Sequence, residues 1–320
     1  MLVSSRAEAI VRTVIPLLFA CLSAPLLAWA QPAAPAWPAV RAGLVVDGAW
    51  LAAHQADRDV VVLHVGRDRT TFDKGHVCGA RFVALADIAV TKDGLPNEMP
   101  PVDDLRRTFE RVGVGDATRV ILYGDRQGLF AARAFVALDY LGHGHHAALL
   151  DGGLERWQSE QRPTCTESTA PTPGSLTATA RPQIIATMTD VRLVVAGEAG
   201  DTTLVDARPP KEYSGEEAGD GITWPGHIPG AKSLYWMQTL ESEALPVLKS
   251  PDEVRRIVEA AGIAPGRPVI TYCRTGVQAA HAYFTLKWLG LEPRLYDGSY
   301  LEWSNAKDTE VARGAPPPAR

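Results

Sequence analysis

Three stretches of the sequence occur twice and in the same order, and this duplication constrains the fold of the 320-residue chain more than any other feature. Each stretch in the first half lies 146 to 151 residues before its match in the second half. Such constant spacing predicts two copies of one domain. The pairs are KGHVCGA at 74–80 with PGHIPGA at 225–231, VILYGDRQG at 120–128 with VITYCRTG at 269–276, and LLDGGLERW at 149–157 with LYDGSYLEW at 295–303.

Within each copy, short apolar runs alternate with segments of helical periodicity. RVILYG at 119–124 suits a buried strand, and VDDLRRTFERVGV at 102–114 places Leu105, Phe109 and Val112 on one helical stripe. Because alternating strands and helices form parallel sheets covered by helices, we predict an α/β fold with two tandem domains, each a mostly parallel sheet flanked by helices. The predicted boundaries are 40–160 for the first domain, 161–183 for a linker rich in Thr, Pro and Ser, and 184–310 for the second domain.

The first 30 residues have the layout of a cleaved signal peptide. Arg6 and Arg12 precede an apolar run at 14–30 that ends on small residues. Two prolines in the run argue against the alternative of a membrane anchor, and the apolar stretch that continues past Cys21 argues against lipid attachment there. We therefore expect residues 1–30 to be removed and the protein to be periplasmic or secreted, with no membrane association after cleavage. The formal net charge of −5 argues against nucleic acid as a partner.

Three cysteines remain after the predicted signal peptide, and they suggest a working thiol. An odd number of cysteines in an oxidising compartment leaves at least one of them free or in an intermolecular bond. Cys78 and Cys165 could form a disulfide, but sequence alone does not settle whether they pair. Cys273 is the third cysteine, and it ends an apolar run.

The loop that begins at Cys273 favours an anionic ligand. PVITYC at 268–273 is a predicted strand and the segment after Gly276 has helical spacing, so Cys273 lies at a helix N-terminus, where free amides and the helix dipole attract negative charge. Arg274 adds a positive charge, and we expect the pKa of the thiol to fall from about 8.5 toward neutrality. The alternative is an inert buried cysteine. Phosphatases with a cysteine nucleophile need an arginine six positions after the cysteine to bind the phosphate. Position 279 is alanine, so phosphoryl transfer is not expected.

At these residues the chain resembles the tandem-domain rhodanese family, which includes thiosulfate sulfurtransferases and 3-mercaptopyruvate sulfurtransferases. The resemblance implies that Cys273 attacks the outer sulfur of a small anionic donor and carries it as a persulfide until cyanide or a thiol acceptor removes it. It also implies that no metal or organic cofactor is needed. The motifs that carry the resemblance are DARPPKEYSG at 206–215, GHIPGA at 226–231, YCRTG at 272–276 and YDGSYLEW at 296–303.

The resemblance also implies roles for the residues around Cys273. The first copy has Gly124 or Asp125 at the position of the cysteine, so it is expected to be catalytically inactive. Two readings stay open for Asp206 and Arg208: either they orient the loop or the donor, or they form a structural ion pair. The predicted substrate-binding residues are Arg274, Thr275, Gly276, Val277, Gln278 and Arg208, and the predicted supporting residues are Asp206 and His227.

Several alternatives to this reading remain open. Mercaptopyruvate enzymes carry an arginine where this chain has Glu212, which favours thiosulfate as the donor, although Lys211 next to it could partly compensate. A non-catalytic persulfide carrier or redox-sensing module would use the same loop. His227 has a match in the inactive copy, His76, which favours a structural role. The HGHH cluster at 143–146 lies in a predicted turn without a second ligand group, so no metal site is predicted.

Overall fold

The computed structural model of the chain describes residues 1–2, 36–168 and 170–315. Contacts divide the chain into residues 1–34 and residues 35–320, and the description below concerns the second unit. Apart from its first two residues, the predicted signal peptide lies outside the described residues. Among the described residues, no helix is long and apolar enough to cross a membrane.

Two five-stranded sheets form the framework, and both are parallel throughout. Their strand orders are the same at every position, β1-β8-β7-β2-β4 and β10-β14-β13-β11-β12, which confirms the predicted tandem α/β architecture. The first sheet contains β1 (Val45–Val46), β8 (Ala147–Leu150), β7 (Arg119–Gly124), β2 (Val60–Gly66) and β4 (Arg81–Ala84). The second contains β10 (Ile185–Ala186), β14 (Pro293–Tyr296), β13 (Val269–Tyr272), β11 (Thr203–Asp206) and β12 (Lys232–Ser233).

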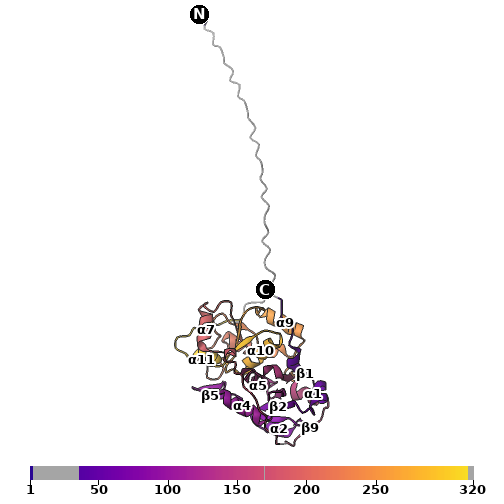
Figure 1. Ribbon diagram of the computed structural model, residues 1–320. Helices are drawn as coiled ribbons and strands as arrows, with labels where there is room; N and C mark the ends of the chain where they lie inside the picture. The colour runs from indigo at the N-terminus through magenta and orange to yellow at the C-terminus, as the bar shows by residue number, and fades with distance from the viewer. Residues whose placement is uncertain (3–35, 169, 316–320) are drawn as a thin grey trace. The chain divides into compact units, whose positions relative to one another are not determined.

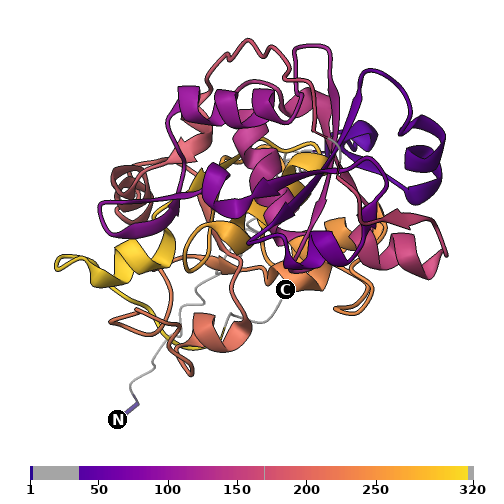
Figure 2. The same ribbon diagram turned by 90° about the horizontal axis from the view of Figure 1, so that it is seen from below.

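Helices cover both faces of each sheet. Successive strand residues point to opposite faces, and apolar residues on both faces need cover. In β7, Val120 and Leu122 join one apolar cluster while Ile121 and Tyr123 join another. Figure 2 shows the first half, in indigo and purple, with helices on both sides of its strands. The first half has α1 (Gly48–His54), α2 (Thr70–Lys74), α3 (Leu85–Ile88), α4 (Val102–Arg111), α5 (Leu129–Tyr140) and α6 (Gly153–Ser159). The second half has α7 (Met188–Val195), α8 (Pro210–Ser214), α9 (Pro251–Ala260), α10 (Val277–Trp288) and α11 (Ser299–Asn305).

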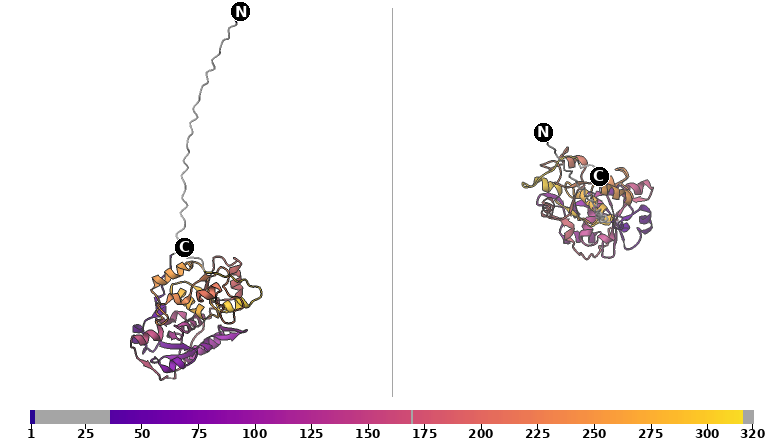
Figure 3. Two further views of the ribbon diagram at one scale, coloured as in Figure 1. Left: turned by 180° about the vertical axis from the view of Figure 1, so that it is seen from behind. Right: turned by 90° about the horizontal axis from the view of Figure 1, so that it is seen from above.

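The two halves share one hydrophobic core built on α5 and α10. Both helices are buried along almost their whole length, as expected of helices that are apolar on every side. Phe135 of α5 and Phe284 of α10 meet edge to face with ring centroids 4.9 Å apart. Figure 1 shows the two helices between the purple first half and the orange to yellow second half, and the left view of Figure 3 shows the two halves from behind. The inner faces of both sheets therefore pack against a single apolar cluster.

A disulfide between Cys78 and Cys165 fastens the linker to the first half. The pairing that sequence left open is thus present. Cys78 directly follows the short strand β3 (His76–Val77), and Cys165 belongs to the short strand β9 (Thr164–Cys165), which pairs antiparallel with β3. Further along the linker, the Gly174 amide donates to the Glu110 carbonyl at 2.8 Å, and the Thr179 amide donates to the Leu141 carbonyl at 2.9 Å. The linker therefore lies along the first domain rather than as a free tether.

Candidate active site

The loop from Cys273 to Gly276 connects the end of β13 to the start of α10. Cys273 follows the last strand residue, Tyr272, and Gly276 is the N-cap of the helix with a φ of 84°. A Cβ at Gly276 would lie 3.1 Å from Oδ1 and 3.2 Å from the carbonyl oxygen of Asp297, so both the backbone angle and the space favour glycine. The predicted strand, cysteine and helix start are thus confirmed, and the first turn of α10 directs its amides into the loop.

The tryptophan motif of the second half, at residues 296–303, forms hydrogen bonds with the backbone of the cysteine loop. The Cys273 amide donates to Ser299 Oγ at 3.3 Å, and the Cys273 carbonyl accepts from the Tyr300 amide at 2.9 Å. The Arg274 carbonyl accepts from the Leu301 amide at 3.0 Å. The start of α11 therefore fixes the backbone on which the thiol is carried.

The thiol of Cys273 is almost completely buried and is the single free cysteine among residues 36–168 and 170–315. Burial raises the pKa of this thiol, and hydrogen bonds from the amides of Ala279, Thr275 and Gln278 oppose the rise without cancelling it. The expectation of a pKa lowered toward neutrality was therefore wrong for the unloaded protein. Loss of water around a thiolate outweighs the amide dipoles here.

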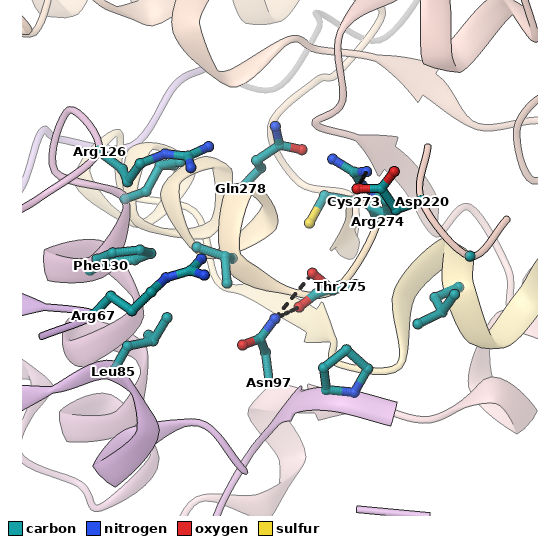
Figure 4. Close-up of a pocket in the computed structure, with 15 residues that line it drawn as sticks. Arg67, Leu85, Asn97, Arg126, Phe130, Asp220, Cys273, Arg274, Thr275 and Gln278 are labelled. Carbon is teal, nitrogen blue, oxygen red and sulfur yellow. Dashed lines mark hydrogen bonds and ion pairs between the residues drawn. The ribbon is translucent and has the colours of Figure 1, made fainter. Parts of the chain in front are cut away.

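The Arg274 guanidinium is directed toward two carboxylates rather than toward the sulfur. Its Nη2 lies 3.8 Å from Glu212 Oε1, and its Nη1 lies 3.6 Å from Asp220 Oδ2. Arg274 still lines the cavity beside Cys273, as Figure 4 shows. Its positive charge is thus shared with protein carboxylates, which helps to explain why the thiol is not ionised more readily.

The raised pKa of Cys273 predicts how its reactivity depends on pH. Because the folded protein favours the neutral thiol, the thiolate fraction at pH 7 is smaller than that of free cysteine. We expect the rate constant for alkylation of Cys273 by iodoacetamide to rise about tenfold per pH unit from 7 and to keep rising beyond pH ~8.5, where free cysteine levels off. Mass spectrometry of the Cys273 peptide measures this rate, with free cysteine as the control. A plateau below pH 7 would contradict the prediction.

A cavity of about 560 Å³ lies between the two halves and opens onto Cys273. Asn97 of the first half donates through Nδ2 to both the carbonyl and Oγ1 of Thr275, each at 3.1 Å (Figure 4). The first half therefore both forms one wall of the cavity and holds the cysteine loop. The cavity is lined from the first half by Arg67, Leu85, Pro96, Asn97, Arg126, Leu129 and Phe130, and from the second half by Asp220, Gly221, Cys273, Arg274, Thr275, Val277, Gln278 and Leu301.

The predicted pair of Asp206 and Arg208 is buried in the second half and does not line this cavity. Arg208 Nε lies 2.9 and 3.1 Å from the two Asp206 oxygens, and Arg208 Nη2 also donates to the Gly226 carbonyl at 2.7 Å. The guanidinium carbon stacks 3.9 Å from the centre of the Tyr300 ring. This geometry favours the structural ion pair over substrate binding by Arg208. The pair nevertheless borders the site, because the amide of Tyr300 donates to the Cys273 carbonyl.

His227 and His76 make matching contacts in the two halves. Nδ1 of His227 bonds the Tyr213 carbonyl and Nδ1 of His76 bonds the Phe72 carbonyl, each at 2.8 Å, and each imidazole stacks on the ring of that same residue. Burial lowers the pKa of His227, so the neutral ring is favoured. These contacts support a structural role for both histidines.

The HGHH segment forms a short turn between α5 and β8, as predicted. His143 is bonded to the Thr118 carbonyl at 3.1 Å through Nε2. No group of three or more His, Cys, Asp or Glu side chains in the described part of the chain is placed to hold a metal ion.

The first half contains a matching loop without a nucleophile. Tyr123 accepts a hydrogen bond from the Val77 amide, as Tyr272 does from the Ile228 amide, so Gly124 is the counterpart of Cys273. A Cβ at Gly124 would lie 2.2 Å from the Val65 carbonyl oxygen, which leaves no room for a side chain there. The structure thus favours Gly124 over Asp125 at the cysteine position.

Sequence reasoning missed four polar residues of the cavity: Arg67, Asn97, Arg126 and Asp220. Arg67 and Arg126 follow β2 and β7, the strands that correspond to β11 and β13. A signal for them was available, because side chains after neighbouring parallel strands gather at one sheet edge. That this edge faces the second half could not be read from the sequence.

The Rhodanese-like domain family matches the chain twice, at residues 47–160 and 193–306. The sulfur carrier protein TtuD of Thermus thermophilus is 33% identical over 284 residues, which cover 85% of this chain and 97% of that protein. A thiosulfate sulfurtransferase of Pseudomonas aeruginosa is 32% identical over 242 residues, 75% of this chain and 86% of that protein. Human 3-mercaptopyruvate sulfurtransferase is 32% identical over 245 residues, 75% of this chain and 80% of that protein.

Solved structures show the same fold. A variant of EanB in complex with ergothioneine superposes with a TM-score of 0.75 over 86% of this chain and 71% of that chain, at 21% sequence identity. At this level of identity the likeness concerns the fold alone.

Proposed function

This chain belongs to the rhodanese family, whose members compared above include sulfurtransferases, and from that premise we propose that it moves sulfane sulfur from thiosulfate to cyanide or a thiol through a persulfide on Cys273. One observation carries the proposal. A free cysteine stands at the start of α10 in a cavity between the halves, with three backbone amides directed at its sulfur.

In the proposed first step, the Cys273 thiolate attacks the outer sulfur of thiosulfate. The sulfur–sulfur bond of the donor breaks, and its electron pair leaves with sulfite. The terminal sulfur of the resulting persulfide carries the negative charge, and the amides of Ala279, Thr275 and Gln278 are preorganised to stabilise charge at this place. In the second step cyanide or a thiolate takes the outer sulfur, and Cys273 leaves as a thiolate.

Glu212 supports thiosulfate over mercaptopyruvate as the donor. It is buried, burial raises its pKa, and its nearer oxygen faces Arg274, so it competes with a substrate carboxylate for that guanidinium. Lys211 is exposed and lies 3.0 Å from Glu217, which leaves it poorly placed to compensate. On the wall that carries Cys273, a keto acid therefore finds no cation that is free of a protein carboxylate.

Steady-state rates with the two donors test this preference. We expect kcat/KM for thiosulfate to exceed that for mercaptopyruvate by about tenfold or more, about 1.4 kcal/mol of transition-state free energy. Glu212→Gln should shift the ratio toward mercaptopyruvate, whereas the exposed change Glu198→Gln, far from Arg274 and Lys211 in the sequence and not part of the cavity lining, should not. If mercaptopyruvate is the faster donor in the native chain, the donor assignment is wrong and mercaptopyruvate sulfurtransferase takes its place.

A second candidate is a persulfide carrier or redox-sensing module that delivers sulfur to a partner protein. The similarity to a protein named as a sulfur carrier supports it. The carrier would load Cys273 stoichiometrically but turn over slowly with cyanide and every small thiol, whereas the enzyme turns over repeatedly.

We also propose that the protein is exported. The layout of residues 1–30 and the Cys78–Cys165 disulfide support this, since disulfides persist in oxidising compartments. The intact mass of protein from the periplasmic or culture fraction of its host tests the proposal. A chain that begins near Gln31 supports export, and a chain that retains residues 1–30 contradicts it.

A further inference from the structure

Two arginines of the inactive half line the cavity across from the cysteine loop. Arg67 follows β2, and Arg126 follows β7. In Figure 4 both guanidinium groups extend into the cavity from the side of Leu85 and Phe130, opposite Cys273. Within the described residues neither side chain forms an ion pair. The cavity is thus lined by two cations without an ion-pair partner in the described part of the chain, of which Arg67 is attracted to the neighbouring Asp68.

The carboxylates next to these arginines in the sequence accept hydrogen bonds from other groups. Asp68 accepts from the Thr70 amide at 2.8 Å, and Asp125 lies 3.1 Å from Nε2 of His64. On the opposite wall, Arg274 faces protein carboxylates, as described above. An anion that enters the cavity therefore meets its least compensated positive charge at Arg67 and Arg126.

The turn that carries Arg126 has an unusual backbone. Arg126 and the residue after it, Gln127, have φ values of 60° and 53°. Non-glycine residues adopt this left-handed region at an energetic cost, and such residues gather at functional sites. The turn places the exposed Arg126 side chain along the lining of the cavity.

The size and the lining of the cavity indicate which class of ligand these arginines could bind. At about 560 Å³ it has far more room than thiosulfate fills. Leu85, Leu129 and Phe130 form an apolar wall near the arginines. A fitting occupant has a negative group at one end, a short carbon chain, and a reactive group that reaches Cys273 at the other end.

We propose that Arg67 and Arg126 bind the carboxylates of the sulfur acceptor, an organic thiol whose carboxylates lie several bonds from its sulfur. The inference rests on the proposed function and specifies its second step. The acceptor thiol loses its proton to solvent, and its thiolate attacks the outer sulfur of the Cys273 persulfide. The bond between that sulfur and Sγ breaks, Cys273 leaves as a thiolate, and the acceptor departs as a persulfide, with no net oxidation or reduction.

Single-turnover transfer from the loaded full-length protein tests the proposal. Glutathione and its diethyl ester serve as probes, because they share one thiol and differ in their carboxylates. We expect the ratio of the two transfer rate constants, glutathione over ester, to fall at least tenfold in Arg67→Ala/Arg126→Ala. The matched control is Arg107→Ala, an exposed arginine of α4 that pairs with Asp104 and does not line the cavity. An unchanged ratio in the double variant, or an equal fall in the control, would overturn the proposal.

A second measurement separates this inference from the proposed function. Iodoacetate and iodoacetamide alkylate the unloaded Cys273 thiol and differ in one carboxylate, so their rate ratio reports the attraction of anions to the cavity without sulfur transfer. We expect that ratio to fall in the double variant and not in Arg107→Ala. If the native chain takes no sulfur from thiosulfate, the proposed function fails, whereas the alkylation ratio still decides whether the two arginines attract a carboxylate. If loading succeeds and neither ratio changes, the inference alone fails.

Discussion

Replacement of Cys273 by serine should reduce sulfur loading from thiosulfate to background. The serine hydroxyl occupies nearly the same space but is a far weaker nucleophile near neutral pH, because it stays protonated. In the proposed cycle the native chain gains one sulfur atom after incubation with thiosulfate and removal of the excess. Intact mass spectrometry measures the gain, and peptide mapping assigns it to Cys273 rather than to Cys21, which lies outside the described residues.

The other two cysteines supply the control for this experiment. Cys78 and Cys165 are bonded to each other, so their joint replacement by serine should leave one added sulfur on Cys273. The sulfurtransferase proposal fails if the native chain gains no sulfur, or if Cys273→Ser gains as much as the native chain.

Replacement of Arg133 by methionine should destabilise the protein by about 3–5 kcal/mol, because it leaves a buried carboxylate without a counter-charge. The Arg133 side chain of α5 is fully buried, and its Nη1 lies 2.6 Å from Asp297 Oδ1 of the second half. Burial and the Asp297 charge already raise the pKa of Glu98 to about 7, so removal of Arg133 adds to an existing excess of negative charge. Urea unfolding measures the free energy.

This change should also slow sulfur loading in the protein that remains folded. Asp297 borders Gly276, the N-cap of the helix after Cys273, and Arg133 Nη2 donates to the Asn97 carbonyl at 2.6 Å. Asn97 in turn holds Thr275. The control for the unfolding measurement is Arg107→Met. This change breaks an exposed ion pair and should lower the free energy of unfolding by less than about 1 kcal/mol. Similar costs for the two changes would mean that the Arg133 pair contributes little.

The sequence predicted the elements that local pattern and repetition determine. The helix expected at 102–114 is α4, at Val102–Arg111, and the strand expected at 119–124 is β7. Cys273 lies between strand and helix as expected, because an apolar run, a glycine and a helical spacing follow one another within a few residues. The duplication predicted two equivalent sheets, and their strand orders agree.

The features that sequence did not predict depend on how the two halves meet. Helices α5 and α10 are apolar on all sides, so their periodicity does not say which face packs against which. Without knowledge of that contact, the sequence does not predict that Arg67 and Arg126 line the same cavity as Cys273. The direction of the Cys273 pKa shift depends on how deeply the thiol is buried, and the direction of the Arg274 side chain depends on Glu212 and Asp220, which belong to other segments.

The pairing of Cys78 with Cys165 bears on how long a loaded sulfur can remain on the protein. Many persulfides decay when a neighbouring thiol attacks them and releases hydrogen sulfide. With two cysteines locked together and Cys273 alone in its cavity, the described part of the chain has no resolving thiol. In the proposed cycle the persulfide on Cys273 therefore persists until an acceptor from outside the protein removes its outer sulfur. No cysteine in the described part of the chain can attack it first.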